Sequence, residues 1–277
     1  MKKWYAVIGD PIGHSLSPFM HNSWFAQQEI DATYIPIHVK AEMLEQSIAS
    51  MKLLGIDGFN VTIPHKEKIL PFLDELDDMA EKMGAVNTVV RLPNGQLKGY
   101  NTDGLGFVRS LEEAIGQQKR QQPLLIIGAG GAARGIAFAL EASGYEDITI
   151  CNRTVEKATS ICEELTQSAH SLSLQQASEC LDQFSIIIQT TPAGLKNSNF
   201  DLPFSIKKLN SKAIVADIVY NPIMTPLLQA ASEQGATVVS GLGMFVHQGA
   251  LAFSYWTGQN PDIVAVKEQL LENLGGN

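Results

Sequence analysis

The stretch from Leu124 to Leu140, LLIIGAGGAARGIAFAL, constrains the fold more than any other part of this chain. Its opening apolar run predicts a buried parallel strand, and a glycine turn and a helical pattern follow without a gap. Gly128 permits the tight turn, Gly130 lets a phosphate approach the backbone, and the N–H groups at the helix start favour an anion. Ala133 takes the third position, where only a small side chain is needed. The stretch predicts a dinucleotide-binding strand, turn and helix, with an ordinary glycine-rich turn as the alternative.

The length of 277 residues favours two α/β domains. In the first we expect βα units followed by a hairpin at a sheet edge, with strands at residues 5–9, 33–39, 58–63, 87–92 and 96–100. In the second we expect an open parallel sheet with helices on both faces, with strands beginning near residues 124, 147, 185, 213 and 236. We place the first domain at residues 1–103 and the second at 104–243. The segment 244–277 holds two helices and returns to the first domain.

Composition excludes several classes of function. A net charge of −9 disfavours nucleic acid and anionic membranes as partners, since both call for a basic patch. No apolar run approaches the roughly 18 residues of a membrane span, and the start of the chain lacks a signal-peptide core, so we expect a cytoplasmic protein. The cysteines at 151, 162 and 180 are odd in number without CxxC spacing, and the six histidines form no ligand pair. We therefore expect neither disulfides nor a metal.

The second strand of the nucleotide domain ends at Asn152, Arg153 and Thr154. This end faces the adenosine ribose, where an arginine can pair with a 2′-phosphate and an acidic residue would suit the 2′-hydroxyl. Arg153 therefore favours NADP over NAD. The alternative is a solvated arginine at a helix start with Thr154 as its cap. Thr190 closes a later apolar segment near the same edge, although Thr-Pro is also common turn chemistry.

Two stretches in the first domain are unusual for plain structure. Ser15 and Ser17 precede a helix with a proline near its start, so two hydroxyls and free N–H groups suit a carboxylate. Asn60 and Thr62 share one face of a strand, and Lys66 follows its carboxyl end, where ligands bind in such folds. Plain alternatives are a cap at Ser17 and a solvated lysine.

Asp103 adds a carboxylate at the start of the helix that leaves the first domain. A role as helix cap would explain it without any ligand.

Taken in order, SLSP, NVTIPHK, GAVNTV, GYNTDG, GAGGAAR, NRT and GLGMFVHQGALAF resemble the shikimate dehydrogenase family over nearly the whole chain. The resemblance implies NADPH-dependent reduction of 3-dehydroshikimate to shikimate in aromatic amino-acid biosynthesis. It also implies a substrate domain completed by the C-terminal helices and a Rossmann-type, doubly wound NADP-binding domain. A monomer or a homodimer is compatible with it.

The resemblance also assigns the site. Lys66 and Asp103 are the implied catalytic pair. The substrate contacts are Ser15 and Ser17 for the carboxylate, and Asn60, Thr62, Lys66, Asn87, Asp103, Tyr220 and Gln248 for the ring. The cofactor contacts are Gly128, Ala129, Gly130, Gly131 and Ala132 for the pyrophosphate, Asn152, Arg153, Thr154 and Lys157 for the adenosine phosphate, and Thr190, Ile218, Gly241 and Met244 toward the nicotinamide.

Two alternatives remain open at this point. A quinate or quinate/shikimate dehydrogenase would differ in the ring substituents it accepts, and often in its cofactor. A noncatalytic dinucleotide sensor would have no need of Lys66 with Asp103.

Overall fold

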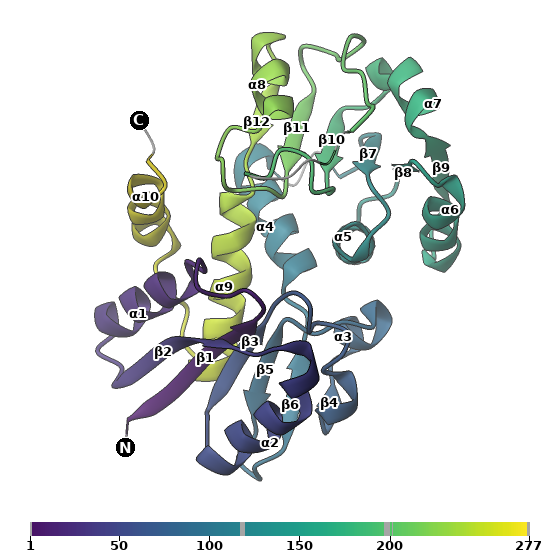
Figure 1. Ribbon diagram of the computed structural model, residues 1–277. Helices are drawn as coiled ribbons and strands as arrows, with labels where there is room; N and C mark the ends of the chain where they lie inside the picture. Colours follow the sequence, from purple (N-terminus) through teal and green to yellow (C-terminus); the bar gives the residue numbers. More distant parts are fainter. Residues whose placement is uncertain (1, 117–119, 197–199, 201, 276–277) are drawn as a thin grey trace. The chain divides into compact units, whose positions relative to one another are not determined.

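The computed structural model describes residues 2–116, 120–196, 200 and 202–275, and the chain divides into two compact units. The first unit comprises Met1–Thr102 with Gln248–Leu271. The second comprises Asp103–His247 with Glu272–Asn277. Figure 1 labels the helices and strands of both.

The first unit is built on a mixed six-stranded sheet with the strand order β2-β1-β3-β5-β6-β4. Strand β1 pairs in parallel with β2 and β3, whereas β5 pairs antiparallel with both β3 and β6. Its elements are β1 (Lys3–Gly9), α1 (Ser17–Gln27), β2 (Ala32–His38), η1 (Ala41–Met43), α2 (Leu44–Leu54), β3 (Gly58–Val61), η2 (Leu70–Phe72), β4 (Glu75–Leu76), α3 (Asp78–Met83), β5 (Thr88–Arg91) and β6 (Leu97–Tyr100).

The β5–β6 hairpin forms as expected, but its predicted place at the sheet edge is wrong. The two-residue strand β4 pairs with β6 and takes the edge. Such a short strand leaves no alternating pattern that a sequence reading could detect.

Side chains of β1 point alternately to the two faces of the sheet, where they pack against different helices. Tyr5 stacks on Phe25 of α1 at 5.2 Å between ring centroids, and on Trp256 of α9 (Leu242–Thr257) at 4.9 Å. Ile8 belongs to a core on the other face that includes Ile48 of α2. The apolar run in α9 is therefore buried against this sheet, and α10 (Ile263–Asn273) follows it.

The second unit has a six-stranded, wholly parallel sheet with the order β12-β11-β10-β7-β8-β9. This is the doubly wound order in which the strand sequence reverses beside the first strand, β7. Its elements are α4 (Asp103–Ile115), β7 (Leu124–Ile127), α5 (Gly131–Ala142), β8 (Ile148–Asn152), α6 (Val155–Glu164), β9 (Ala169–Ser173), α7 (Leu174–Glu179), η4 (Leu181–Gln183), β10 (Ile186–Gln189), β11 (Ile214–Asp217), α8 (Pro226–Glu233) and β12 (Thr237–Val239).

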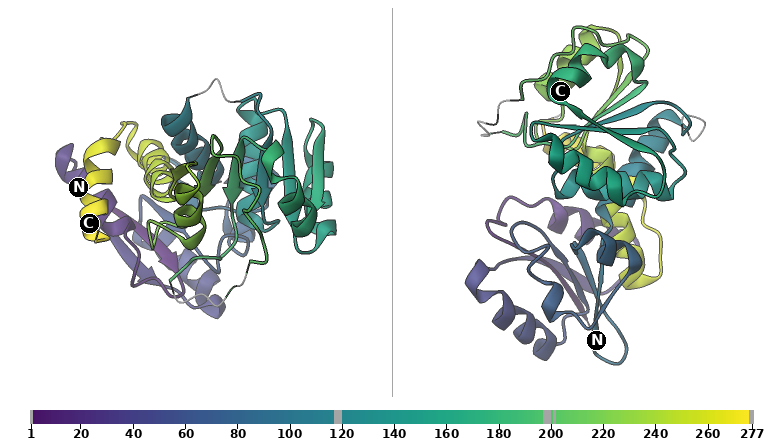
Figure 2. Two further views of the ribbon diagram at one scale, coloured as in Figure 1. Left: turned by 90° about the horizontal axis from the view of Figure 1, so that it is seen from above. Right: turned by 90° about the vertical axis from the view of Figure 1, so that its right-hand side faces the viewer.

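Both faces of this sheet are covered, and Figure 2 shows helices on either side of the strands. All residues of β7 are buried, and Leu125 and Ile127 share a core with residues of α7 and α8. Helices α4 and α5 pack so closely that a Cβ on Gly104 of α4 would lie 2.4 Å from the Gly135 carbonyl oxygen of α5.

Strand β9, which the sequence reading did not predict, forms the outer edge of the sheet. Its sequence AHSLS is only partly buried, so it lacks the apolar run of a central strand.

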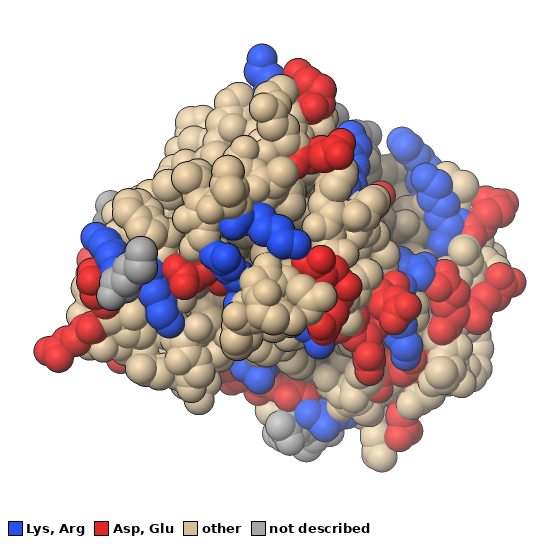
Figure 3. Space-filling view, turned by 90° about the horizontal axis from the view of Figure 1, so that it is seen from below, with Lys and Arg blue, Asp and Glu red and all other residues tan. Residues whose placement is uncertain are grey.

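Within the described residues, no helix combines the length and apolar character needed to cross a membrane. On the molecular face in Figure 3, acidic and basic side chains are interspersed among other residues.

Candidate active site

The glycine turn after β7 depends on a backbone conformation that other residues rarely adopt. Gly128 has φ 112°, and a Cβ there would lie 2.6 Å from the Thr190 hydroxyl oxygen. That hydroxyl donates to the Ile127 carbonyl at 2.7 Å, while the Gly128 N–H donates to the Cys151 carbonyl at 2.8 Å. Thr190 thus supports the turn from the neighbouring strand end.

The start of α5 is open and carries free N–H groups. Gly130 is the N-cap residue, and no side chain among the described residues caps the helix. A Cβ on Gly130 or Gly131 would meet nothing within 4 Å, whereas Ala133 is fully buried behind the turn. Ala129 and Ala132 flank the turn and are half-buried. This arrangement can hold a pyrophosphate through backbone N–H groups and the helix dipole.

The end of β8 lies beside this turn, because Ile127 pairs with Cys151. Arg153 and Lys157 are exposed there, and Thr154 occupies the N-cap position of α6 without a side-chain capping bond. The Asn152 side-chain amide donates to the Thr154 carbonyl at 2.9 Å and fixes the loop. Two cations are therefore available to a phosphate at this edge.

The end of β11 approaches a later segment of the same unit. A Cβ on Gly241 would lie 2.2 Å from the Ile218 carbonyl oxygen, so only glycine fits without a shift. Tyr220 stacks on Phe245 with centroids 4.7 Å apart, and burial raises its pKa. Met244 is half-buried one residue before Phe245.

A buried carboxylate that sequence reasoning missed organises two of these strand ends. Asp217 closes β11 and is 1% exposed. It accepts hydrogen bonds from the Val219 N–H at 2.9 Å, the Thr225 hydroxyl at 2.8 Å and the Gln189 amide at 3.4 Å. Desolvation by burial raises the pKa of Asp217 to about 6, although these hydrogen bonds act in the opposite direction.

Gln189 extends this network into the loop after β10. Its amide donates to the carbonyls of Thr191 at 3.1 Å and Ala193 at 3.0 Å, and its oxygen accepts the Thr191 N–H. The loops that follow β10 and β11 are thus held by one set of buried hydrogen bonds. Those loops carry Thr190, Ile218 and Tyr220 of the predicted site.

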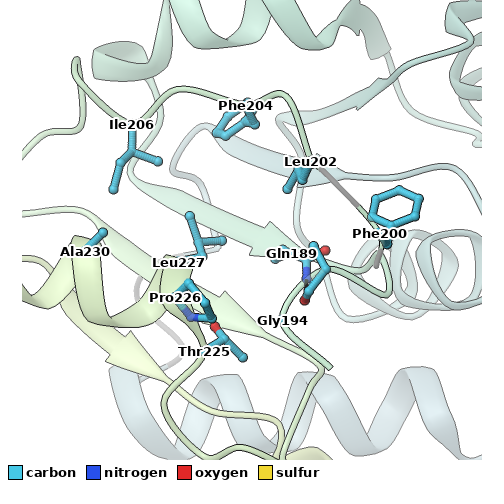
Figure 4. A pocket seen from close by; sticks show the side chains of 11 residues that line it. Gln189, Gly194, Phe200, Leu202, Phe204, Ile206, Thr225, Pro226, Leu227 and Ala230 are labelled. Carbon is cyan, nitrogen blue, oxygen red and sulfur yellow. Dashed lines mark hydrogen bonds between the residues drawn. The ribbon is translucent and has the colours of Figure 1, made fainter. Parts of the chain in front are cut away.

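A hollow beside α8 is a second place where a ligand could be sought (Figure 4). Its polar side chains, Gln189 and Thr225, are already engaged with Asp217. The rest of its lining is largely apolar and includes Phe200, Leu202, Phe204, Ile206 and Leu227. A phosphate or a polyol would find few partners there, so the glycine turn is the better candidate for an anionic ligand.

In the first unit, the two serines before α1 are brought together. The helix begins at Ser17, with Leu16 as the N-cap residue and no side-chain capping bond among the described residues. The interpretation of Ser17 as a cap is therefore wrong. Its N–H donates to the Ser15 hydroxyl oxygen at 3.3 Å, which leaves the Ser15 proton for another acceptor.

A buried polar network joins β3 to the start and end of the hairpin. The Asn60 amide donates to the Asn87 carbonyl at 3.1 Å and to the Thr88 hydroxyl at 3.0 Å. The Asn87 side chain in turn accepts the Thr102 N–H at 2.9 Å and donates to the Thr102 hydroxyl at 3.0 Å. Thr62 follows on the same strand end and is half-buried. Sequence reasoning missed Thr88 and Thr102, because Asn60 and Asn87, which they contact, lie 28 and 15 residues away along the chain.

The predicted catalytic pair is divided between the two units. Lys66 lies in the first unit, half-buried, and its carbonyl accepts the Val86 N–H at 2.8 Å. Asp103 opens the second unit as the first residue of α4, so its carboxylate belongs to the first helical turn. Gln248, half-buried on α9, begins the segment that rejoins the first unit.

The chemical groups of the predicted site residues indicate the type of ligand that these residues suit. No group of three or more potential metal ligands occurs among the described His, Cys, Asp and Glu residues. Hydroxyl, amide, ammonium and carboxylate groups instead suit a small polyhydroxylated acid. The turn with its neighbouring cations suits a phosphorylated dinucleotide.

Comparisons with known proteins agree with this chemistry. Residues 7–89 match the shikimate dehydrogenase substrate binding domain, 110–218 the shikimate / quinate 5-dehydrogenase family and 241–271 the shikimate 5′-dehydrogenase C-terminal domain. A curated relative from Lysinibacillus sphaericus (strain C3-41), named shikimate dehydrogenase (NADP(+)), is 60% identical over 100% of both chains.

Two solved structures share the fold over nearly the full length. One is a shikimate dehydrogenase in complex with NADP+, with TM-score 0.90 and 39% identity over 99% of this chain and 96% of that one. The other is a quinate dehydrogenase from Corynebacterium glutamicum in complex with NAD, with TM-score 0.89 and 28% identity over 98% of this chain and 99% of that one. From the matched domains and the full-length relative, this chain belongs to the shikimate dehydrogenase family.

Proposed function

We propose that this protein catalyses the reversible, NADPH-dependent reduction of 3-dehydroshikimate to shikimate, a step toward chorismate and the aromatic amino acids. The observation that carries the proposal is the 60% identity, over the full length of both chains, to a relative named shikimate dehydrogenase (NADP(+)). The three unpaired cysteines also fit a reducing compartment, so we propose a cytoplasmic enzyme, acting as a monomer or homodimer.

The cofactor side of the proposal rests on the second unit. The open turn from Gly128 to Ala132 has the N–H groups and the space for a pyrophosphate. Asn152, Arg153, Thr154 and Lys157 would hold the adenosine phosphate end. Thr190, Ile218, Gly241 and Met244 would border the nicotinamide. When bound, NADPH supplies the hydride that adds to the C3 carbonyl carbon.

The substrate side rests mainly on the first unit. Ser15 and Ser17 would donate their hydroxyl protons to the substrate carboxylate. The side chains that would contact the ring hydroxyls and carbonyl are Asn60, Thr62, Asn87, Asp103, Tyr220 and Gln248. The buried network around Asn60 and Asn87 supports this assignment, because it fixes both amides before substrate arrives.

Lys66 would stabilise the alkoxide that develops at C3. Its ammonium can neutralise that charge and donate a proton to the oxygen, and in the reverse direction it would receive the proton back. Asp103, when ionised, would orient Lys66 and accept a hydrogen bond from a substrate hydroxyl. This pair is the feature that a noncatalytic dinucleotide sensor would not require.

The test is a spectrophotometric assay of the purified protein with shikimate and with quinate, each with NADP and with NAD. We expect the highest kcat/KM for shikimate with NADP. Faster turnover of quinate with NAD would instead make the protein resemble the quinate dehydrogenase whose fold it shares. Binding of NADP without turnover of either substrate would favour the sensor.

A further inference from the structure

His65 comes directly before Lys66, the proposed proton donor, in a segment without helix or strand. This segment, residues 62–69, lies between β3 and η2, so no regular hydrogen-bond ladder fixes the place of Lys66. His65 is fully buried, whereas Lys66 is half-buried, and both belong to the first unit. The position of the lysine therefore depends on the contacts that hold its neighbours.

Backbone hydrogen bonds tie the segment to the chain beside it. The Thr62 N–H donates to the Ile8 carbonyl of β1 at 3.0 Å, and the Val86 N–H donates to the Lys66 carbonyl at 2.8 Å. The His65 N–H donates back to the Thr62 carbonyl at 2.9 Å. Bonds of this kind form between backbone groups whatever the side chain, so they do not account for a histidine at this position.

The His65 side chain adds a bond to the end of another strand. Its Nε2 lies 2.6 Å from the carbonyl oxygen of Val39, the residue that follows β2. A carbonyl can only accept, so Nε2 must carry the proton and donate it. Val39 is itself held, because its N–H donates to the carbonyl of Gly9, the last residue of β1, at 3.1 Å. His65 thus bonds to a backbone group that the sheet already fixes.

The bond from His65 to Val39 crosses the end of β1, because β1 lies between β2 and β3 in the sheet and pairs in parallel with both. The segment passes close to this end, since a Cβ on Gly9 would lie 2.5 Å from Cγ2 of Thr62. Ligands bind at the carboxyl ends of parallel strands in folds of this kind. His65 therefore joins two strand ends at the edge of the sheet where Lys66 lies.

Packing alone does not explain an imidazole at this position. The Nδ1 atom of His65 is buried and finds no hydrogen-bond partner among the described residues. A buried polar atom without a partner is unfavourable, and an apolar side chain of similar size would fill the space without that cost. The bond that Nε2 makes is what an imidazole provides here and an apolar side chain would not.

We propose that His65 is a positioning residue, which holds Lys66 in place through its hydrogen bond to the Val39 carbonyl. The inference rests on the proposed function, because it takes Lys66 as the proton donor. A proton donor is effective only within hydrogen-bond reach of the atom that it protonates, so a small displacement of Lys66 lowers turnover. His65 is fully buried and acts on the reaction through the residue that follows it.

The kinetic test replaces His65 with phenylalanine and with glutamine. Phenylalanine fills the space without a donor, whereas glutamine can place an amide N–H near the position of Nε2. We expect His65→Phe to lower kcat for 3-dehydroshikimate about 5- to 30-fold with the KM for NADPH changed less than about 2-fold, and His65→Gln to stay within about 3-fold of the parent. A parental kcat in His65→Phe overturns the proposal, and so does an equal loss of kcat in both variants.

A double-mutant cycle separates the positioning of Lys66 from a general loss of structure. In a Lys66→Ala background, His65→Phe should change kcat by less than about 2-fold, because the residue that His65 positions is gone. Ile48→Val removes a buried methyl group from the core of the same unit, and as the control for lost stability it should keep parental kinetics. Fully additive losses of kcat at positions 65 and 66 would contradict action through Lys66.

Nuclear magnetic resonance of protein labelled with ¹⁵N in its six histidines tests the hydrogen bond itself. The His65 signals, assigned by their loss in His65→Gln, should show a protonated Nε2. An Nδ1–H tautomer would leave Nε2 unable to donate, and it overturns the inference even if His65→Phe fails to fold. A parent with a protonated Nε2 that does not reduce 3-dehydroshikimate overturns the proposed function instead, and an active parent whose kcat survives Lys66→Ala overturns the role of Lys66 within it.

Discussion

Replacing Asp217 with asparagine should change how stability depends on pH. The carboxylate is almost completely buried, and desolvation raises its pKa from an ordinary value of 3.8 to about 6. Asparagine has nearly the same shape but does not titrate. Comparing Asp217→Asn with the parent across pH therefore isolates the ionisation of this group, while any lost hydrogen bond adds a pH-independent difference.

The sign and size of this pH dependence follow from the linkage between proton binding and folding. A carboxyl whose pKa is raised on folding binds its proton more tightly in the folded state, so its contribution is fully present below about pH 3.8 and is lost as pH rises through about 6. Each pH unit in this window is worth about 1.4 kcal/mol, which gives about 3 kcal/mol in total. The free energy of unfolding of the parent, minus that of Asp217→Asn, should fall by about this amount between roughly pH 4 and 6.5.

The assay is urea unfolding at several pH values, followed by circular dichroism. Tryptophan fluorescence would miss the relevant region, because Trp4, Trp24 and Trp256 all belong to the first unit. Asp182→Asn, an exposed change in the second unit, is the control and should track the parent at every pH. A constant difference between parent and Asp217→Asn across the range would refute the reasoning.

Two further substitutions test the cofactor side. Arg153→Ala should raise the KM for NADP about 10- to 100-fold and leave that for NAD nearly unchanged, because it would remove the proposed charged hydrogen bonds to the 2′-phosphate; steady-state kinetics with an unaltered NADP to NAD preference would contradict the assignment. Gly128→Ala should lower the free energy of unfolding by about 1–3 kcal/mol and weaken NADP binding, because φ is 112° and the new Cβ would crowd Thr190; parental denaturation and calorimetry curves would contradict this.

Local sequence was sufficient to predict the strand, turn and helix that open the dinucleotide-binding unit. The apolar run before Gly128 and the small residues after it specify a strand, a turn and a helix within one short segment, and β7 and α5 form there. Two of the edge strands, β4 and β9, were not predicted. β9 is only partly buried and β4 has two residues, so neither carries a hydrophobic pattern that identifies it.

The buried hydrogen-bond networks could not be predicted from the sequence. Tyr34 meets Asn60 and Gln189 meets Asp217 across 26 and 28 residues of chain, and these contacts exist only once the sheets have formed. A polar residue in an apolar strand indicates that some partner is needed, but not which one. Ser17 illustrates the same point, since it is the first residue of α1 rather than its cap, and its backbone N–H donates to the Ser15 hydroxyl oxygen.

The most direct test of the proposed chemistry compares turnover of 3-dehydroshikimate with NADPH by the parent and by Lys66→Ala, with Lys68→Ala as a neighbouring exposed control. Loss of Lys66, the proposed proton donor, should lower kcat by about 10² to 10⁴, with a modest change in KM, and the fold should remain intact by circular dichroism. Lys66→Arg should restore little, because arginine is a poor proton donor. Near-parental kcat in Lys66→Ala with only a raised KM would contradict the account, whereas an active parent with a large loss of kcat in Lys66→Ala alone is the result it predicts.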